Sequence, residues 1–431
     1  MFNKLNDKQK EAVMHVDGPC LVLAGAGSGK TKVLTERIVN LINNGVSPFN
    51  ILAITFTNKA AREMRERVYN SIEEEANKIF IGTFHSLGLK IVRENASVIG
   101  YSNNVTILDR DDVNTLIKRF MKELNLDTEH YPVKSILNKI SFAKNEGLSP
   151  DELDKFAKAP LDMASCKVYK MYESALKRSN SVDFDDLLIL PLRIFKKDKS
   201  VLEKYQEHFK YILVDEYQDI YIAGYNLLKA MRNQKDYDLF CVGDDFQSIY
   251  RFSGSQINLI TNFEDFWGET MVGRISRTYR FSDTLAIEEL KSVLNSLPLY
   301  STVYFLGRYN NDLDIIRSDN SFSIVYNNGM EIIYSKRIDL VITYLTIHKS
   351  KGLQSDYVFI LNNKADGSSF PSKIKDDEIV YTLLDNTDEY PYSEERRLFY
   401  VGLTRSKKKT YLLVDKNSES IFIEELKKNY K

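Results

Sequence analysis

The amino-acid sequence predicts an α/β fold in which parallel sheets are covered by helices. Two observations carry this prediction. Short apolar runs such as CLVLAG, ILAITF and YILVDE alternate with stretches whose apolar residues recur at helical spacing. A glycine-rich loop also follows the first of these runs and precedes a long helical stretch. At 431 residues the chain is too long for one ordinary core, so we expect two or more domains.

The strand-like runs divide the chain into two α/β parts and one helical part. Residues 1–87 and 185–271 form the expected first domain, with the runs CLVLAG, ILAITF, IFIGTF, YILVDE and YDLFCVGD. The stretches KVLTERIVNLI and NKAAREMRERVYNSI are expected to be its covering helices. Residues 88–184 show helical patterns and few strand-like runs, which predicts an inserted helical subdomain. Residues 272–431 contain STVYFLG, LVITYLTI, DYVFIL and TYLLVD, which predict a second α/β domain.

The composition is typical of a soluble globular protein, with 43% hydrophobic and 28% charged residues. The longest apolar runs fall well short of roughly 18 residues, so we expect no membrane span. The N-terminus has no apolar signal-peptide core, which favours a cytoplasmic location. Cys20, Cys166 and Cys241 are far apart in the sequence and are expected to be small buried hydrophobes rather than disulfide or metal ligands. The net charge of −1 argues against a uniformly basic surface but permits a local basic groove for nucleic acid.

The segment AGAGSGKT predicts a phosphate-binding loop. It comprises Ala24, Gly25, Ala26, Gly27, Ser28, Gly29, Lys30 and Thr31. The glycines let backbone N–H groups turn toward a phosphate, and the following helix adds a favourable dipole. Lys30 would reach the β- and γ-phosphates, and the Thr31 hydroxyl would hold Mg²⁺. The alternative, a glycine-rich turn without a ligand, is disfavoured because strand, loop, Gly-Lys-Thr and helix coincide.

The segment YILVDEYQD supplies an acidic pair after an apolar strand. Asp215 can hold Mg²⁺, directly or through water, and Glu216 is then placed to orient or deprotonate the attacking water. Taken alone, such a pair is more often a solvated strand end. Together with the glycine-rich loop it predicts a nucleoside triphosphatase, but it does not say what the hydrolysis drives.

Eight segments occur in one order along the chain. They are LNDKQKEAV, AITFTNKAAREMRERV, GTFHSL, VDEYQD, VGDDFQSIYRFSG, RTYRFS, TIHKSKGLQSDYVFI and EERRLFYVGLTRSKK. In this order they resemble a superfamily 1 DNA helicase of the UvrD/Rep type, nearest to the helicase IV branch. The resemblance implies two RecA-like motor domains with an inserted helical subdomain. It also implies ATP hydrolysis in the cleft between the two domains, driving 3′-to-5′ movement on single-stranded DNA and unwinding of duplex DNA.

The resemblance assigns four residues to the base and ribose of ATP. Gln9 would recognise the adenine edge, and a side-chain amide has the donor and acceptor needed to do so. Arg37 and Tyr279 would flank the base. Gln354 stands where most of the family has glutamate, so we expect an altered ribose contact rather than lost binding. Without the other segments, Gln9 would be interpreted as a surface residue at the start of a helix.

The resemblance assigns three more residues to the phosphates. Gln247 would sense the γ-phosphate. Arg280 and Arg405 would come from the second domain and neutralise the charge that develops during phosphoryl transfer, a role worth roughly 10³–10⁵ in rate in other enzymes. The lysines that follow Arg405 are better interpreted as surface residues.

The resemblance also implies a track for single-stranded DNA. Bases would stack on the aromatic residues Phe56, Tyr250 and Phe252, whereas polar groups near the phosphates would be Asn58, Lys59, Thr83, His85, Thr346 and His348. Stacking of this kind tolerates any base sequence. Beyond Asn58 and Lys59, the helix that begins there is expected to be a solvated surface helix with charge pairs three or four residues apart. His85 alone would more often be a structural histidine.

One departure from the family concerns length. Only 65 residues lie between Arg280 and Thr346, where typical relatives insert a second accessory subdomain. Ser253 and Thr278 also replace a common arginine and a common asparagine, which slightly weakens the case for ordinary DNA affinity. We therefore expect a minimal motor, a monomer or weak oligomer, that acts on single-stranded DNA and 3′-tailed duplexes.

Two alternatives stay open from the sequence. One is a DNA-binding ATPase or scaffold with impaired unwinding, which the set of catalytic residues argues against. The other is a nuclease-fused recombination subunit, for which the sequence offers no cysteine cluster.

Overall fold

The computed structural model describes residues 5–15, 18–25, 27–232, 238–250, 255–268, 270–275, 284–285, 287–317, 319–327, 329–363, 370–372, 391–414 and 419–429. The described residues form two units. The first takes the residues up to Asp245 and those from Tyr250 to Ile275. The second takes Phe246–Ile249 and the described residues from Thr284 onward.

A six-stranded parallel sheet forms the centre of the first unit, in the order β3-β2-β6-β7-β1-β8. Its strands are β1 (Cys20–Ala24), β2 (Ile51–Thr55), β3 (Phe80–Thr83), β6 (Tyr211–Val214), β7 (Asp238–Gly243) and β8 (Met271–Ile275). The first five confirm the strands predicted from the apolar runs. The sixth was not predicted. The expected domain boundary at residue 271 falls at the start of β8, which pairs with β1 and so belongs to this sheet.

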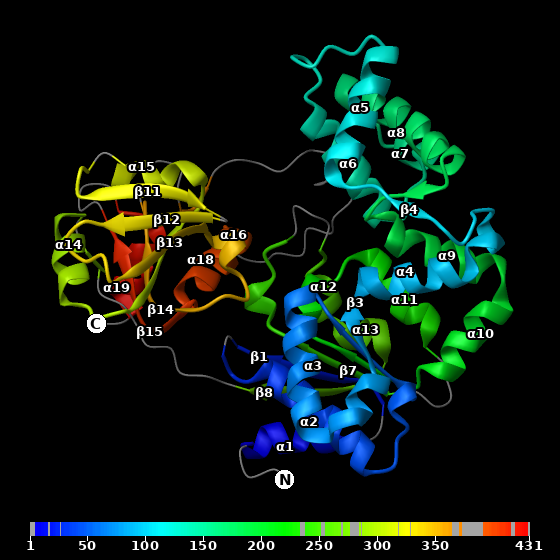
Figure 1. Ribbon diagram of the computed structural model, residues 1–431, viewed down its shortest axis with the longest axis horizontal. Coiled ribbons are helices and arrows are strands. Elements are labelled where there is room, and N and C mark those ends of the chain that lie inside the picture. Colours follow the sequence, from blue (N-terminus) through cyan, green and yellow to red (C-terminus); the bar gives the residue numbers. More distant parts are fainter. Residues whose placement is uncertain are drawn as a thin grey trace. The chain divides into compact units, whose positions relative to one another are not determined.

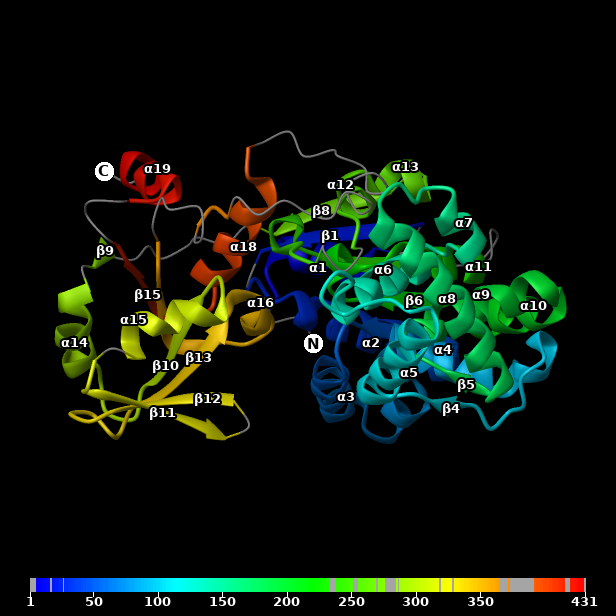
Figure 2. The same cartoon turned by 90° about the horizontal axis from the view of Figure 1, so that it is seen from above.

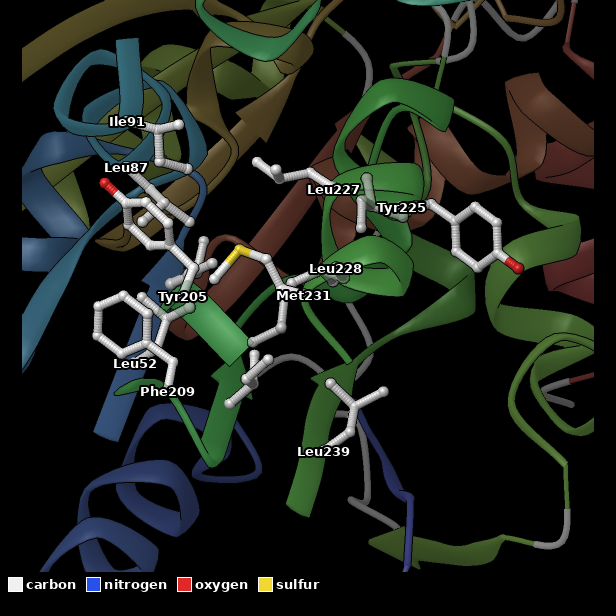
Figure 3. Close-up of a cluster of buried hydrophobic side chains, with 14 of the residues drawn as sticks. Leu52, Leu87, Ile91, Tyr205, Phe209, Tyr225, Leu227, Leu228, Met231 and Leu239 are labelled. Carbon is white, nitrogen blue, oxygen red and sulfur yellow. The ribbon is translucent and has the colours of Figure 1, made fainter. Parts of the chain in front are cut away.

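Both faces of this sheet are buried over the five predicted strands, which is why these strands read as continuous apolar runs. Alternate residues of one strand face two different cores. In β2, for example, Leu52 and Ile54 pack in one core, whereas Ile51 and Ala53 pack in the other. Figure 3 shows part of the first core, where Leu52 and Leu239 come from strands and the other labelled side chains come from helices and the segments beside them.

The helices that cover this sheet have the spacing that the sequence indicated. They are α1 (Asp7–Met14), α2 (Lys30–Asn43), α3 (Asn58–Ile72), α4 (Phe84–Asn95), α9 (Asp186–Lys197), α10 (Lys199–His208), α11 (Ile222–Met231), α12 (Asn258–Thr261) and α13 (Phe263–Trp267). In α3 the buried residues are Ala61, Met64 and Val68, on one face of the helix. Figure 1 shows α4 and α9 side by side.

Four helices in the first unit share a core of their own. They are α5 (Arg110–Glu123), α6 (Val133–Asn145), α7 (Pro150–Asp154) and α8 (Pro160–Arg178). Their buried residues run from Ile117 to Leu176 and do not overlap with the cores of the sheet. The short strands β4 (Thr106–Ile107) and β5 (Ser181–Val182) pair where the chain enters and leaves this group. We call α5 to α8 the helical subdomain.

A seven-stranded mixed sheet forms the second unit, in the order β11-β12-β13-β10-β14-β15-β9. Its strands are β9 (Thr284–Leu285), β10 (Thr302–Gly307), β11 (Phe322–Asn327), β12 (Gly329–Tyr334), β13 (Val341–Thr346), β14 (Ser355–Ile360) and β15 (Ser406–Leu413). The four predicted strands are confirmed as β10, β13, β14 and β15, and Figure 2 shows β10 and β13 lying side by side. The antiparallel pair β11–β12 was not predicted.

The described helices of the second unit are α14 (Ile287–Ser296), α15 (Asp314–Arg317), α16 (Ile347–Ser350), α18 (Ser393–Leu403) and α19 (Ile421–Asn429). All three cysteines of the chain, which lie in the first unit, are buried thiols. Within the part of the chain that the structure describes, each helix is too short or too polar to cross a lipid bilayer.

Candidate nucleotide and nucleic-acid site

The glycine-rich loop connects β1 to α2, as predicted. Gly27 and Gly29 have φ angles of +67° and +94°, a backbone conformation that residues other than glycine rarely adopt. The Ser28 N–H and hydroxyl both donate to the Gly25 carbonyl, at 3.1 and 2.6 Å, which closes the turn. Ala26 lies outside the described residues. The loop thus has the tight turn that a phosphate cradle requires.

Lys30 and Thr31 begin α2 and face the acidic strand ends of the same sheet. The Lys30 ammonium donates to the Ala24 carbonyl at 3.2 Å and lies 3.9 Å from an Asp244 carboxylate oxygen. The Thr31 hydroxyl donates to Asp215 at 3.3 Å. Because β1, β6 and β7 are parallel neighbours, residues that follow each strand meet at one edge of the sheet. The loop and the acidic pair, separate in sequence, therefore converge.

Asp215 is a buried carboxylate with a perturbed acidity. Burial, and then the charge of Glu216, raise the pKa of Asp215 to about 7, while Lys30 acts in the opposite direction. The Thr31 hydroxyl and the Asp215 carboxylate offer oxygen ligands, the donor type that Mg²⁺ prefers. The donor set at this edge therefore fits a magnesium ion.

Glu216 is held by a residue that sequence reasoning missed. The Gln218 amide N–H₂ donates to the Glu216 carboxylate, and its carbonyl oxygen accepts from the Asp244 backbone N–H at 2.9 Å. Gln218 is fully buried, so its amide is fixed between the two acidic strand ends. Gln218 stands in the segment VDEYQD, two residues after Glu216. A glutamine at that spacing does not by itself indicate a function, because only the fold brings it between the two acidic strand ends.

Gln9 contacts the glycine-rich loop. Asn6 and Gln9 form a reciprocal capping box at the start of α1, and the Gln9 amide also donates to the Ser28 carbonyl at 2.9 Å. The same amide nitrogen would lie 3.1 Å from a Cβ placed at Gly29. Gln9 is therefore next to the loop, where the predicted adenine contact requires it.

Arg37 is buried rather than exposed to a ligand. Its guanidinium donates to the Val13 carbonyl at 2.9 Å and forms an ion pair with Asp238 of β7. Only 1% of Arg37 is accessible to solvent. A place beside the base would require Arg37 to leave Asp238.

An aromatic-walled cavity lies at the carboxyl ends of β2 and β3, within the first unit. It has a volume of about 430 Å³, and its lining includes Phe56, Asn58, Thr83 and His85. Four of the residues predicted to contact DNA are thus brought together. Tyr250 joins them, because its ring stacks on Phe56 with centroids 5.4 Å apart and planes 15° from parallel.

Two further aromatic residues line this cavity and were not predicted from the sequence. Phe184 is 59% exposed and lies 5.5 Å from the His85 ring, centroid to centroid. Tyr221 packs against Phe56 at 6.2 Å. Burial lowers the pKa of His85, which favours the neutral imidazole. Neither aromatic residue carries a sequence signal, because a single aromatic side chain near an apolar run is usually part of a core.

Lys59 does not line the cavity. Its side chain is mostly exposed and lies 3.9 Å from Glu63 one turn along α3. Further along α3, Glu63 also pairs with Arg67 at 3.9 Å, which matches the solvated, charge-paired helix that the sequence predicted beyond Lys59.

The remaining candidates that the structure describes lie in the second unit. Arg405 is buried and donates to the Gln247 side-chain oxygen at 3.1 Å and to the Val401 carbonyl at 2.8 Å. Thr346 caps α16, and burial, reinforced by nearby cations, lowers the pKa of His348 to about 4. Gln354 is exposed. Phe252, Tyr279 and Arg280, together with Ser253 and Thr278, lie outside the described residues.

Comparison with known families gives a match over more than half of the chain. The sequence pattern of the UvrD/REP helicase N-terminal domain matches residues 5–267. The chain belongs to this family. As a UvrD/REP helicase domain, it carries the RecA-like parallel sheet that the resemblance implied, and its match covers the glycine-rich loop, the acidic pair and the aromatic-walled cavity.

Several similar proteins are named ATP-dependent DNA helicase PcrA. The protein of Leuconostoc citreum is 43% identical over 297 residues, which cover 68% of this chain and 39% of that protein. The protein of Bacillus subtilis strain 168 is 44% identical over 302 residues, covering 69% and 41%, respectively. This UvrD/REP helicase chain thus spans about two fifths of the length of the curated relatives that it matches.

Proposed function

We propose that this chain is an ATP-dependent DNA helicase or translocase that moves 3′ to 5′ on single-stranded DNA. One observation carries the proposal. The glycine-rich loop, the acidic pair and the aromatic-walled cavity all follow the carboxyl ends of strands of a single parallel sheet. A nucleotide site and a nucleic-acid site on one rigid edge are what coupling of hydrolysis to movement needs. The family match and the names of the relatives support the same activity.

In the proposed reaction, the first unit binds the phosphates and directs the attacking water. Lys30 would leave the Ala24 carbonyl and pair with the β- and γ-phosphates. Thr31 and Asp215 would hold Mg²⁺, which neutralises charge on the phosphate oxygens when bound. Glu216, kept in orientation by Gln218, would accept a proton from water or orient it. Gln9 would read the adenine edge from beside the loop.

The second unit would contribute arginines to the transferred phosphoryl group. We propose that Arg405 and Arg280 act in this way and that Gln247 reports the presence of the γ-phosphate. The described contact between Arg405 and the Gln247 side chain supports the pairing of these two roles. Arg37 and Tyr279 beside the base, and Gln354 at the ribose, stay predictions from the resemblance.

The DNA would be held by stacking and by neutral polar groups. Phe56 and Tyr250 offer parallel ring faces, on which bases can stack without regard to sequence. His85, whose pKa is lowered by burial, would act as a neutral hydrogen-bonding group rather than as a cation. Phe252, Thr346 and His348 would extend the track, and Asn58 and Lys59 would contact phosphates.

The first experiment measures ATP hydrolysis with and without single-stranded oligo(dT), at low and at moderate salt. We expect strong stimulation that fades as salt rises, because phosphate contacts release counterions. The Lys30→Ala variant is the blank for contaminating ATPases. Turnover that ignores DNA at both salt concentrations would contradict the proposal. Strand separation on 3′-tailed and 5′-tailed duplexes then tests direction, with activity expected only on the 3′-tailed substrate.

A DNA-stimulated ATPase with impaired unwinding is the second candidate. It is favoured by the short segment between Arg280 and Thr346, whose described α-helices and strands are β9, α14, β10, α15 and β11 to β13. Robust DNA-stimulated hydrolysis without separation of the 3′-tailed duplex would select it.

A further inference from the structure

The C-terminal end of α6 and the residue after it contact two different segments of the first unit. Lys144 ion-pairs with Asp183 and Asp186, each at 2.8 Å. The next residue, Asn145, donates to Asp185 at 3.3 Å. These contacts lie outside the core of the helical subdomain, in which the buried apolar residues of α6 pack. Consecutive residues at one helix end therefore hold the segment that connects the subdomain back to α9.

Glu146, the third consecutive residue, contacts a different segment. Its carboxylate accepts from the Gln256 amide, with nitrogen–oxygen distances of 3.2 and 3.3 Å. Glu146 is partly buried, and burial raises its pKa to about 7. A buried carboxylate lowers the stability of the protein when it is ionised. The contact of Glu146 with Gln256 is therefore better explained by a role in positioning Gln256 than by a contribution to stability.

The Lys144 contacts fix one wall of the aromatic-walled cavity. Asp183 and Asp186 each accept from the other's backbone N–H, at 3.0 and 2.9 Å, and so close a tight turn. Phe184 lies within this turn and presents its exposed ring to the cavity beside His85. Movement of α6 would therefore move the turn that carries Phe184.

The Glu146 contact reaches a second part of the cavity lining. The residue before Gln256, Ser255, donates to the Tyr250 carbonyl at 3.2 Å and forms an isolated bridge with Tyr221. The Gln256 N–H also points to the Ile220 carbonyl, at 3.5 Å. Ile220 and Tyr221 line the cavity. Gln256 therefore directly follows the residue that contacts both Tyr250 and Tyr221.

We propose that residues 144–146 form a joint through which the helical subdomain positions these two parts of the lining of the aromatic-walled cavity. The joint sets how tightly single-stranded DNA is held, and Glu146 and Gln256 are positioning residues rather than contacts to DNA. This inference rests on the proposed function, because it assigns the cavity to DNA. The inference gives the helical subdomain a role in that function: its helices control how tightly the cavity beside the sheet holds DNA.

The test compares Glu146→Ala with Glu123→Ala. Both remove one carboxylate, but Glu123 is exposed, and the ion pair described for it is with Arg119 on its own helix, at 2.9 Å. For Glu146→Ala we expect the oligo(dT) concentration that half-saturates ATPase stimulation to rise roughly ten-fold, the usual scale for a lost charge-assisted hydrogen bond. DNA-free turnover and the KM for ATP should stay unchanged. Glu123→Ala should match the wild type throughout.

The exchanged pair Glu146→Gln with Gln256→Glu separates positioning from stability. It rebuilds the hydrogen bond with donor and acceptor reversed, so half-saturation should return to near the wild-type value. If Glu146→Ala does not fold, Gln256→Ala removes the same bond from the other side. A folded variant with wild-type half-saturation would overturn the inference. A wild-type protein that neither binds oligo(dT) nor responds to it would instead refute the proposed function, and the joint with it.

Discussion

The acidic pair of the first unit and Arg405 of the second unit stand at opposite ends of their strands. In the first unit, Asp215 and Glu216 follow β6 and Asp244 follows β7, so acidic groups stand at the carboxyl ends of a parallel sheet. In the second unit, Lys351 comes shortly before β14 and Arg405 directly before β15, so cations stand near the amino ends of neighbouring parallel strands.

The partners of these charges differ as well. The acidic groups of the first unit lie beside Lys30, Thr31 and the Gln218 amide, which are side chains. The cations of the second unit are held by the segment Phe246–Ile249. Lys351 and Arg397 donate to its carbonyls, and Arg405 donates to the Gln247 side chain. The first unit thus carries the acidic groups and Lys30, whereas the second unit adds Arg405, and the proposed reaction requires both sets.

The largest expected effect tests this division of charge. Arg405→Ala should lower ATP turnover about a thousand-fold, because a cation that meets charge developing in the transition state is lost. ATP affinity should change little, since the phosphate-binding loop is intact. Lys30→Ala should weaken both turnover and binding. The measurements are steady-state hydrolysis and equilibrium binding of a fluorescent ATP analogue.

Lys407→Ala is the matched control for Arg405→Ala. Lys407 is exposed and lies two residues further along the chain, so its loss should leave turnover near the wild-type value. If Arg405→Ala lost binding as severely as Lys30→Ala, Arg405 would act in the ground state and the division between the units would be wrong.

The next effect compares helix packing in the two units. A Cβ at Gly88 of α4 would lie 1.7 Å from the Leu187 carbonyl oxygen, a backbone atom that cannot turn aside. Gly88→Ala should therefore destabilise the first unit by about 3 kcal/mol or more. Urea unfolding can be followed by the fluorescence of Trp267, the single tryptophan of the chain, which is buried in the same core as α4.

Gly402 in α18 is the helical glycine of the second unit that can be compared with Gly88. The three atoms nearest to a Cβ there all belong to the Ile347 and Ile360 side chains, the closest at 2.9 and 3.0 Å, and side chains can move more readily than backbone. The helix preference of alanine, about 1 kcal/mol over glycine, offsets much of the strain. Hydrogen exchange in α18 should therefore be nearly unchanged in Gly402→Ala. A loss of protection as large as that in α4 of Gly88→Ala would show that both units pack equally tightly.

A smaller effect concerns the aromatic-walled cavity. Phe56→Ala should raise the half-saturating oligo(dT) concentration by about ten-fold, because base stacking on an aromatic ring contributes roughly 1–3 kcal/mol per base. Tyr69→Ala, which removes an exposed aromatic side chain from α3, is the control and should bind like the wild type. Equal affinities for wild type and Phe56→Ala, measured by fluorescence anisotropy, would remove the cavity from the DNA track.

These comparisons also show what the sequence could predict. The strands β1, β2, β6 and β7 were found because burial on both faces makes them continuous apolar runs. The strand β8 was missed because its residues alternate in exposure and include a glycine, so it lacks such a run. The antiparallel pair β11–β12 was missed for the same reason, since one of its faces is largely exposed.

The candidate site likewise has a part that the sequence predicted and a part that it could not predict. The phosphate-binding loop was predicted because its chemistry lies within eight consecutive residues. The ion pair of Arg37 with Asp238 joins residues 201 positions apart, and the Gln218 bridge depends on two strands ending side by side. The place of Phe184 beside His85 likewise depends on how α4 and the turn before α9 meet. Contacts that the fold creates between distant residues leave no local pattern in a single sequence.

A pH dependence is expected at Glu146, and it changes the stability of the fold rather than turnover. Burial raises its pKa from 4.5 to about 7, so the folded state binds this proton more tightly than the unfolded state. The resulting stability is present below pH 4.5 and is lost as the pH rises through about 7. Glu146→Gln, which cannot ionise, should keep it. The urea stability of this variant should therefore gain about 2 kcal/mol on the wild type between pH 5 and pH 7. The difference in unfolding free energy between the two proteins could instead stay constant over this range. That result would mean that Glu146 is ionised throughout and that its bond to Gln256 offsets the cost of burial.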